Sequence, residues 1–409
     1  MKGGFFQVKS PAEFVGLLQD FPVLEVETVA LALAHGRVLA ADAVAPHDLP
    51  LVNRSCMDGF AVSARDAFGA SEANPAYLDK VGDLSIDEPV DLVLEPGQCV
   101  GIVTGGTLPL GADAVVMVEH TGDLGAGTIE IRKSSAPGDN VMLRGEDAVA
   151  GTTALPAGTV LRPQEIGLLA ALGFAEIAVY CRPRCGIIST GDELVPVTET
   201  PRPGQVRDVN SHALAALINA AGGTPSLYGL IPDREEELIV AVAQAVDEND
   251  VVFISGGSSV GLRDLTQTAI QALPDSEVLA HGVAVSPGKP TILARVGAKA
   301  VWGLPGQVTS AQVVMLVFGC PFLRHVQGEP QAFSPARRRT IATRLARNLH
   351  SKPGREDYVR VRLEADQAHP VLGKSGLLRT MILADGLVCI PADSEGLEAG
   401  AVVQVWLLG

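Results

Sequence analysis

Glycine-rich loops with hydroxyl, carboxylate and lysine side chains recur between residues 189 and 306. They read Ser-Thr-Gly-Asp-Glu-Leu at 189–194, Ser-Gly-Gly-Ser-Ser-Val-Gly at 255–261, Ser-Pro-Gly-Lys-Pro at 286–290 and Gly-Leu-Pro-Gly at 303–306. Glycine lets backbone N–H groups approach an anion, while hydroxyl groups and a lysine add hydrogen bonds and positive charge. The loops therefore predict a site for a phosphate-bearing ligand. The residues expected to contact it are Thr190, Gly191, Asp192, Ser255, Gly256, Gly257, Ser258, Ser259, Pro287, Gly288, Pro305 and Gly306.

Carboxylates near these glycines could also hold a metal ion. Asp192, Glu193 and Asp264 offer hard oxygen ligands, which suit a Mg²⁺ ion that bridges a phosphate to a protein carboxylate. Taken singly, each motif is more often a tight turn or a helix cap than a ligand site. Their recurrence at successive strand ends favours a ligand. The Walker and GxGxxG patterns are absent from the sequence, so an ordinary nucleotide-binding site is not supported.

Alternating strands and helices between residues 184 and 327 would position these loops. Apolar runs predict strands at residues 185–189, 226–230, 251–255 and 301–303. Helices are expected at 211–221, from a cap at Asp233 to Val246, at 264–273 and at 309–323. Apolar strands that alternate with helices are typical of a doubly wound, parallel α/β sheet buried on both faces. Ligands of such sheets bind at the carboxyl ends of the strands, where these loops meet.

Two further helices are expected near the N-terminus and one in the middle of the chain. Ser10-Pro11-Ala12-Glu13 forms a capping box that would start the first helix. The second is predicted from Glu27 to His35, before Gly36, and the third at 163–172, before Gly173.

Other segments predict β structure. Short β-rich runs at 101–103, 114–119 and 128–132 lie between clusters of glycine, proline and aspartate, which indicates a compact β-rich domain. This domain also contains acidic residues beside glycines at 55–61 and 144–147, which by themselves are ordinary turn sequences. The tail after residue 336 returns to short strands and turns that suit a small β-barrel-like module.

Composition limits the classes of function. The net charge of −16 repels nucleic acid, so a binder of phosphate backbones is not expected. The apolar runs are far shorter than the ~20 residues of a membrane span. Without an apolar leader at the N-terminus, the chain is expected to be soluble and cytoplasmic. The six cysteines form no CxxC pair, and Cys181 and Cys185 fit a buried strand better than half of a metal site.

Ordered motifs along almost the whole chain resemble those of the molybdopterin molybdenumtransferase family, which includes the E domain of gephyrin. They are Gly36-Arg37-Val38-Leu39-Ala40, Met57-Asp58-Gly59, Thr104-Gly105 through Pro109, Gly111-Ala112-Asp113-Ala114-Val115-Val116, Arg144-Gly145-Glu146-Asp147, Thr190-Gly191-Asp192-Glu193-Leu194, Gly256-Gly257, Pro287-Gly288-Lys289-Pro290, Gly303-Leu304-Pro305-Gly306, Pro353-Gly354-Arg355 and Ala384-Asp385-Gly386-Leu387. The order and number of these motifs make the resemblance specific.

The resemblance implies a multidomain fold and an elongated homodimer. Its parts would be a helical linking domain from residues 1–45 and 148–180, a β-rich domain from 46–147, a doubly wound α/β molybdopterin-binding domain from 181–328 and a C-terminal β-barrel-like domain from 329–409. The active site would lie between the α/β domain of one subunit and the β-rich domain of the other.

The implied reaction inserts molybdenum from molybdate into adenylylated molybdopterin and releases AMP, with Mg²⁺ assisting. The resemblance gives Asp58, Asp147, Glu193, Asp264 and Lys289 as catalytic residues, with Glu193 and Asp264 as metal ligands. The residues expected to bind molybdate are Ser286, Lys289, Arg355 and Ser375. The expected partners are the small-molecule substrates, a second copy of the chain and the molybdopterin adenylyltransferase, without nucleic acid or membrane.

Some positions depart from the family pattern. The family usually has a basic residue at Ser286, an aromatic residue at Leu265, a small or amide residue at Arg54 and an Asn-Pro pair at Gln307-Val308. Loss of a cation at 286 would weaken oxyanion binding by about 1–3 kcal/mol. The departures leave open a tungstate-inserting paralogue or a non-catalytic cofactor carrier. An unrelated phosphotransferase is a further alternative.

Overall fold

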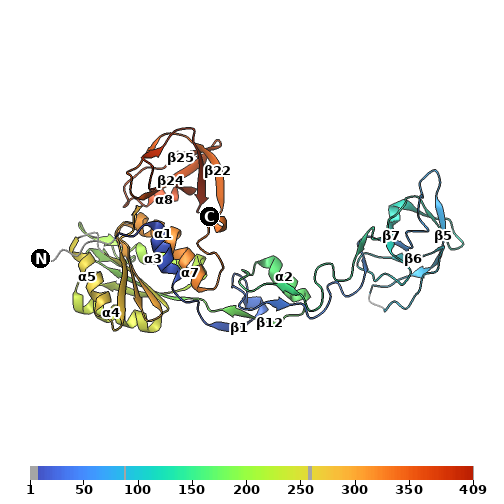
Figure 1. Cartoon of the computed structure of the whole chain (residues 1–409), viewed down its shortest axis with the longest axis horizontal. Helices are drawn as coiled ribbons and strands as arrows, with labels where there is room; N and C mark the ends of the chain where they lie inside the picture. The colour runs from blue at the N-terminus through green and yellow to red at the C-terminus, as the bar shows by residue number, and fades with distance from the viewer. Residues whose placement is uncertain (1–7, 87–88, 257–259, 409) are drawn as a thin grey trace.

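The computed structural model describes residues 8–86, 89–256 and 260–408, and the side chains of 260–264 are outside this description. The molecule is elongated, with an α/β domain and a barrel at one end, a β-rich domain at the other, and a narrow linking region between them (Figure 1). Within the described residues, no helix is both long and apolar enough to span a membrane.

The α/β domain is built on a six-stranded sheet in the order β16-β13-β17-β21-β20-β18. Its strands are β13 (Arg184–Thr190), β16 (Thr224–Ile231), β17 (Val251–Gly256), β18 (Ser276–His281), β20 (Ile292–Val296) and β21 (Lys299–Pro305). The four strands from β16 to β21 are parallel. Their carboxyl ends therefore share one edge of the sheet, as the strand and helix pattern predicts.

Helices cover both faces of this sheet, and the central strand β17 is apolar and buried from Val251 to Ile254. Val251 and Phe253 of β17 pack on one side and Val252 and Ile254 on the other, each pair within a separate apolar core. Burial of side chains of this size contributes roughly 1.5–3 kcal/mol each. The helices are α3 (Asn210–Ala220), α6 (Val308–Val314) and α7 (Cys320–Val326) on the first face, and α4 (Glu235–Glu248) and α5 (Val260–Gln271) on the second.

Three details of the α/β domain differ from the prediction. The sheet is mixed, because β20 and β18 continue it as antiparallel strands that the sequence analysis did not assign. The predicted helix at 309–323 is α6 and α7 joined by a π-helical segment, Met315–Gly319. Asp233 does not cap α4, whose N-cap residue is Arg234. In contrast, Cys185 is buried in β13, as expected, and burial raises the pKa of its thiol.

Helix α1 (Pro11–Gln19) packs against the α/β domain. Its capping box is confirmed: the Ser10 N–H donates to Glu13 Oε2 over 2.7 Å, and the Glu13 N–H donates to Ser10 Oγ over 3.2 Å. Phe14 and Leu18 are fully buried in the same core as Trp302. This part of the chain thus contributes to the α/β core, although it falls within the range that we expected to form the linking domain.

The linking region is less helical than predicted. The expected helix from Glu27 to His35 is wrong, because this segment forms strand β1 (Val26–Ala30) and a 3₁₀ turn. The β-branched side chains of Val26, Thr28 and Val29 favour the extended pairing with β12 (Glu176–Tyr180), so tertiary contact outweighs local helical spacing. The predicted helix near residue 163 is confirmed as α2 (Pro163–Ala171). A short antiparallel pair completes the region: β2 (Ala43–Val44) and β11 (Thr153–Leu155).

The β-rich domain contains a sheet in the order β7-β4-β6-β5-β9-β8. Its strands are β4 (Gly59–Val62), β5 (Ala76–Asp83), β6 (Gln98–Ile102), β7 (Ala114–Met117), β8 (Thr121–Asp123) and β9 (Thr128–Ile131). The domain has its own apolar cores on the two sides of this sheet. It is therefore a separate folded body at the far end of the molecule (Figure 1).

The C-terminal β module is a closed five-stranded barrel. Each of its strands pairs with two others around a ring, in the order β24-β25-β22-β28-β26 and back to β24. The strands are β22 (Thr340–Leu345), β24 (Glu356–Glu364), β25 (Gln367–Pro370), β26 (Gly386–Ile390) and β28 (Val402–Leu407), with helix α8 (Arg379–Ile382) before β26. A short strand of the α/β domain, β19 (Val285–Ser286), pairs with β24 and joins the two units.

Candidate functional site at the carboxyl ends of the strands

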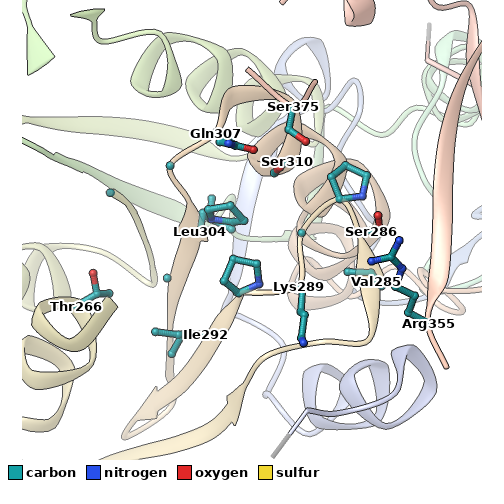
Figure 2. Close-up of a pocket in the computed structure, with 17 residues that line it drawn as sticks. Thr266, Val285, Ser286, Lys289, Ile292, Leu304, Gln307, Ser310, Arg355 and Ser375 are labelled. Carbon is teal, nitrogen blue, oxygen red and sulfur yellow. The ribbon is translucent and has the colours of Figure 1, made fainter. Parts of the chain in front are cut away.

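A cavity of about 290 Å³ opens where the carboxyl ends of β17 and β21 meet the barrel. Figure 2 shows its polar side chains entering from several loops, with the Arg355 guanidinium next to Ser286. The lining residues are Gly256, Thr266, Val285, Ser286, Pro287, Gly288, Lys289, Pro290, Ile292, Gly303, Leu304, Pro305, Gly306, Gln307, Ser310, Arg355 and Ser375. The cavity therefore combines backbone at glycine turns with hydroxyl groups and two cations.

The loop that carries Lys289 requires glycine at one position. Gly288 has a φ of +123°, and a Cβ atom there would lie 2.5 Å from Val314 Cγ2. The turn is closed by Thr291, whose hydroxyl donates to the Gly288 carbonyl over 2.7 Å. The Lys289 carbonyl accepts from the Val283 N–H over 2.9 Å. These contacts fix the backbone of Lys289 while its side chain remains available to the cavity.

Arg355 is held by a buried carboxylate at the start of the barrel. Asp357 is 8 % exposed and accepts from the Ser351 hydroxyl over 2.5 Å. Its other carboxylate oxygen lies 3.1 Å from Arg355 Nε, close enough for an ion pair but without hydrogen-bond alignment. Asp357 also stands opposite Ser286 in the β19–β24 ladder. Asp357 thus contacts Arg355 and lies opposite Ser286, so two candidate anion ligands from different domains lie on either side of it.

Ser375 belongs to a loop of the barrel that is tied to the α/β domain. The Ser375 carbonyl accepts from the Thr309 N–H over 3.2 Å and from the Thr309 hydroxyl over 2.5 Å. Thr309 is fully buried at the start of α6. The Ser375 hydroxyl group therefore reaches the cavity from a loop whose backbone is anchored beside Ser310 and Gln307, as Figure 2 shows.

The loop after β13 forms an adjoining polar group. Asp233 accepts from the Thr190 hydroxyl over 2.7 Å and from the Asp192 N–H over 3.3 Å. In return, the Asp233 N–H donates to Asp192 Oδ1 over 3.1 Å. Asp233 thus stabilises the Thr190–Asp192 turn. Its carboxylate is occupied by these hydrogen bonds, which explains why Asp233 does not cap α4. Glu193 folds back over this turn, because its Oε2 would lie 2.7 Å from a Cβ at Gly191.

Asn210 links two of the glycine loops, and sequence reasoning missed it. Its amide nitrogen donates to Ser255 Oγ over 2.6 Å and to the Gly306 carbonyl over 2.9 Å. In the sequence, Asp208 and Asn210 precede a helix and are indistinguishable from ordinary helix-capping residues. Only the folded sheet shows that Asn210 sits between the ends of β17 and β21.

The structure brings together nine of the predicted site residues as lining of the cavity: Gly256, Ser286, Pro287, Gly288, Lys289, Pro305, Gly306, Arg355 and Ser375. Thr190, Gly191, Asp192 and Glu193 lie at the carboxyl end of β13 and Ser255 lies near the end of β17, at the same edge of the sheet, but they do not line the cavity. Gly257, Ser258 and Ser259 are outside the described residues. Asp264 lies in α5, and its side chain is also outside the description.

Asp58 and Asp147 lie far from this cavity within one chain. Asp58 directly precedes β4 of the β-rich domain, at the opposite end of the molecule (Figure 1). Thr104 donates to Asp58 Oδ1 through its N–H over 2.7 Å and through its hydroxyl over 2.9 Å. These hydrogen bonds lower the pKa of Asp58 and keep it ionised. The Asp147 N–H donates to the Leu49 carbonyl, where the chain leaves the domain.

The donor chemistry at the strand ends suits a hard divalent cation bound together with a phosphate. Mg²⁺ is usually held by one or two carboxylates, with water and phosphate oxygens as its other ligands. Glu193 supplies one such carboxylate beside the glycine turn. Among the residues that the structure describes, no cluster of three or more acidic, histidine or cysteine side chains is placed to hold a metal by itself.

Comparisons with known proteins agree along the whole chain. The sequence profile of the MoeA N-terminal region (domain I and II) matches residues 10–173, that of a probable molybdopterin-binding domain matches 186–325, and that of the MoeA C-terminal region (domain IV) matches 342–408. Molybdopterin molybdenumtransferase 2 of Mycobacterium tuberculosis is 36% identical over 388 residues, which cover 93% of this chain and 94% of that protein. The chain belongs to the molybdopterin molybdenumtransferase family.

Other members of the molybdopterin molybdenumtransferase family support the full-length match. A putative molybdopterin biosynthesis protein of Methanocaldococcus jannaschii is 35% identical over 392 residues, covering 94% of this chain and 92% of its own length. A crystal structure of the molybdopterin biosynthesis MoeA protein from Pyrococcus horikoshii matches 98% of this chain and 100% of that chain, with a TM-score of 0.84 and 30% identity. The family fold predicted from the sequence motifs is therefore confirmed.

Proposed function

We propose that this protein inserts molybdenum from molybdate into adenylylated molybdopterin and releases AMP. Family membership over the full chain supports this activity. The observation that carries the proposal is the cavity that Lys289, Arg355, Ser286 and Ser375 all line at the carboxyl ends of the sheet. Cations and hydroxyl groups along one cavity suit a small oxyanion beside a larger phosphate-bearing ligand.

Molybdate would bind between Lys289 and Arg355. A tetrahedral dianion can accept hydrogen bonds from the ammonium and guanidinium groups, while Ser286 and Ser375 add hydroxyl donors. Asp357 offsets part of the positive charge and fixes the direction of Arg355. The pocket would therefore recognise the oxyanion by the placement of its donors as well as by charge.

The phosphate-bearing pterin would occupy the glycine turns next to the oxyanion. Asn210 holds the ends of β17 and β21 together, and Asp233 holds the turn after β13. Backbone N–H groups at such turns can face a pyrophosphate without a side chain in the way. This arrangement would place the two thiolates of the pterin near the bound oxyanion, so that the reacting groups meet in a fixed orientation.

A divalent cation would be held by Glu193 and Asp264 together with the pyrophosphate oxygens. When bound, Mg²⁺ would polarise the phosphoanhydride that is cleaved when AMP leaves. The adenylylated substrate would come from the molybdopterin adenylyltransferase, which is the partner enzyme that this chemistry requires.

Asp58 and Asp147 would complete the site from a second subunit. Asp58 belongs to the β-rich domain at the far end of the molecule and Asp147 lies where the chain leaves that domain, so we expect them to approach Lys289 only in an assembly of two copies (Figure 1). A symmetric homodimer would place each β-rich domain over the α/β domain of its partner and form two equivalent shared sites.

The test of the activity incubates the purified protein with adenylylated molybdopterin, Mg²⁺ and molybdate, and measures AMP and the molybdenum-bearing cofactor. We expect both products to depend on molybdate, and tungstate in its place tests oxyanion choice. Tight pterin binding without AMP would indicate a carrier instead. Nucleotide turnover that ignores molybdate would indicate an unrelated phosphotransferase.

A mixing experiment tests the shared site. Asp58→Ala and Lys289→Ala proteins should each be inactive, because each removes one half of both sites. After unfolding and refolding together in equal amounts, half of the dimers would contain one intact site, which restores about a quarter of the original rate. A mixture that stays as inactive as its components, despite verified exchange of subunits, would refute a site built from two chains.

A further inference from the structure

A buried arginine of the barrel, Arg360, belongs to β24, the strand that follows Arg355 directly, but does not line the cavity. It is 8 % exposed. Its Nη1 donates to the Thr380 hydroxyl over 3.0 Å, and its Nη2 donates to the Gly373 carbonyl over 3.1 Å. Both acceptors are neutral, and none of the ion pairs found among the described residues involves Arg360. A cation is therefore buried here without a carboxylate partner in the part of the chain that the structure describes.

Burial of this cation is unfavourable for the fold. A guanidinium group that leaves water loses its hydration, and a neutral apolar side chain in its place would pack without that loss. Burial lowers the pKa of Arg360, and no carboxylate acts in the opposite direction. Its Nε is also buried, without a hydrogen-bond acceptor among the described residues. Buried polar groups with incomplete partners are uncommon in folded proteins, so the reason for an arginine at this position lies in what its two remaining donors hold.

The two acceptors of Arg360 lie at the two ends of the loop that contains Ser375. Gly373 begins this loop after β25, and Thr380 lies in α8 at its other end. The two residues also pack closely, because a Cβ atom at Gly373 would lie 2.6 Å from Thr380 Cγ2. The planar guanidinium presents its donors at fixed positions, so it holds both ends of the loop at one separation. Arg360 thus closes the base of the 373–380 loop.

The rest of this loop is largely exposed to solvent. From 372 to 379, every residue except Ser375 is exposed. Ser375 is tied to the α/β domain through its carbonyl, which accepts from the N–H and the hydroxyl of Thr309. The loop therefore has one anchor in each domain, Thr309 at its middle and Arg360 at its base. Loss of either anchor would leave the direction of the Ser375 side chain poorly fixed.

We propose that Arg360 is a positioning residue for the oxyanion: by holding both ends of the 373–380 loop, it sets the Ser375 hydroxyl at the cavity without contacting molybdate itself. This role rests on the proposed function, in which Ser375 is an oxyanion contact. Figure 2 shows Ser375 and Arg355 at the same cavity. β24 would thus position two oxyanion contacts, Arg355 directly before its first residue and Ser375 through Arg360. A fixed hydroxyl binds an oxyanion more tightly than a mobile one, because less conformational freedom is lost on binding.

The first test measures AMP release by the full-length protein at varied molybdate. Arg360→Met keeps an unbranched apolar side chain but removes the donors, and it should raise the KM for molybdate about three- to tenfold. The kcat and the KM for adenylylated molybdopterin should change little, because the Ser375 hydroxyl contacts only the oxyanion. Arg344→Met is the matched control, since the exposed Arg344 also donates to a backbone carbonyl of the barrel, that of Gly400, over 3.0 Å. The KM of this control should equal that of the parent protein.

A second substitution, at Ser375, separates positioning from a general effect on stability. Ser375→Ala alone should raise the KM for molybdate about tenfold, since a hydrogen bond to a charged group is lost. Arg360→Met should add nothing further in the Ser375→Ala protein, because the two residues act through one contact. An effect of Arg360→Met that persists in that background would overturn the proposal, and so would an unchanged KM in the folded Arg360→Met protein.

Hydrogen exchange measured by mass spectrometry follows the loop itself, independently of activity. Backbone amides of 373–380 should exchange faster in Arg360→Met than in Arg344→Met, while the strands of the barrel stay protected. If Arg360→Met does not fold, Thr380→Val removes one acceptor at nearly constant shape and should give a smaller rise in KM, again only with Ser375 present. A parent protein without molybdate-dependent AMP release would overturn the proposed function and this role with it, whereas an active parent with an unaffected variant overturns only the role of Arg360.

Discussion

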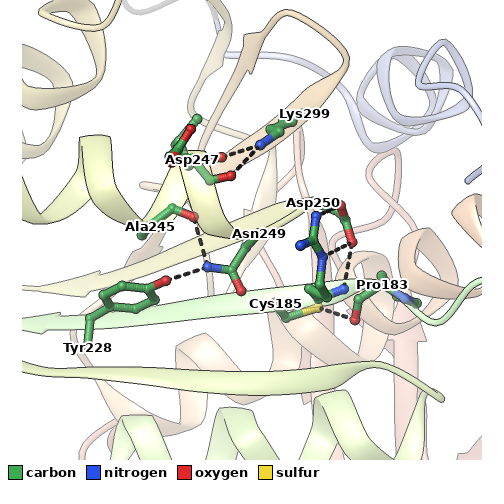
Figure 3. A network of polar contacts seen from close by, with 10 residues as sticks. Pro183, Cys185, Tyr228, Ala245, Asp247, Asn249, Asp250 and Lys299 are labelled. Carbon is green, nitrogen blue, oxygen red and sulfur yellow. Dashed lines mark hydrogen bonds and ion pairs between the residues drawn. The ribbon is translucent and has the colours of Figure 1, made fainter.

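The two ends of the α/β sheet use the same kinds of residue in opposite ways. At the amino ends, polar side chains pair with one another and with the backbone, as Figure 3 shows. Asn249, only 1 % exposed, donates to the Tyr228 hydroxyl over 2.7 Å and to the Ala245 carbonyl over 2.8 Å. At the carboxyl ends, glycine turns leave backbone groups, two cations and several hydroxyls around an open cavity. The first end satisfies its polar groups internally, whereas the second keeps donors available for ligands.

Charged residues show the same contrast. At the amino end, Arg184 makes hydrogen bonds with both carboxylate oxygens of Asp250, through Nε over 3.2 Å and Nη2 over 2.9 Å. Lys299 donates to the Asp247 carbonyl over 3.1 Å, at the end of α4, where unpaired carbonyl groups attract a cation. At the carboxyl end, Arg355 is only partly engaged by Asp357. Changes at the amino end should therefore affect folding, and changes at the carboxyl end should affect the reaction.

The largest effect is expected at the carboxyl end, from Arg355→Ala. Loss of a charge-assisted contact to the oxyanion should raise the KM for molybdate about 10- to 100-fold, because such contacts contribute roughly 1.5–3 kcal/mol. The melting temperature should stay close to that of the parent protein. Steady-state AMP release at varied molybdate measures the KM, with Arg362→Ala on the barrel surface as the control. If the KM is the same in both variants, Arg355 has no role in oxyanion binding.

At the amino end, Asn249→Ala should lower the free energy of unfolding by about 1–3 kcal/mol, because buried partners lose their hydrogen bonds. The KM for molybdate in the folded protein should not change. Urea unfolding gives the stability, and Gln244→Ala, on the exposed surface of α4, is the matched control. A variant as stable as the parent would contradict the structural role that we assign to this end of the sheet.

A smaller effect is expected from Asp357→Asn, which tests whether Asp357 positions Arg355. The substitution keeps the size and one hydrogen-bond acceptor for Ser351 but removes the charge that orients the guanidinium. We expect the KM for molybdate to rise about three- to tenfold while kcat changes little. The reason is that the lost contact stabilises bound molybdate equally before and in the transition state. A fall in kcat with constant KM would instead place Asp357 in the chemical step.

The smallest effect concerns Asp58 and the pH dependence of activity. Its backbone and hydroxyl hydrogen bonds from Thr104 lower the Asp58 pKa below its ordinary value of 3.8. A group with a lowered pKa in the folded protein contributes its stabilisation above the unfolded pKa and loses it as the pH falls through the folded pKa. Thr104→Val removes the hydroxyl donor, so the Asp58 pKa should rise and activity should begin to fall at a higher pH. Titration by NMR, with Thr121→Val as the control, measures this shift, and an unchanged Asp58 pKa would show that the hydroxyl contributes nothing.

Strong local signals in the sequence were sufficient for several elements. The capping box at Ser10 predicted the start of α1, and the glycine at 173 predicted where α2 ends. The apolar run of β17 predicted a central strand because both faces of the sheet are buried. The helix predicted from Glu27 to His35 is wrong because the spacing of its apolar residues does not distinguish a helix from a strand. Pairing with β12 makes this segment a strand. Strands β20 and β18 were missed because each contains a charged residue, Arg295 in β20 and Glu277 in β18, which interrupts the apolar run.

The sequence by itself determined the family, the doubly wound α/β unit and the presence of Ser286, Lys289 and Arg355 in glycine-rich or loop segments. These features are local, because each depends on neighbouring residues along the chain. Only the tertiary structure decided that β19 pairs with β24, which brings Ser286 beside Asp357 and Arg355. It also decided the bridging position of Asn210 and the distance of Asp58 from the cavity. Contacts between distant segments depend on how packed surfaces fit together, and residue spacing along the chain does not encode that fit.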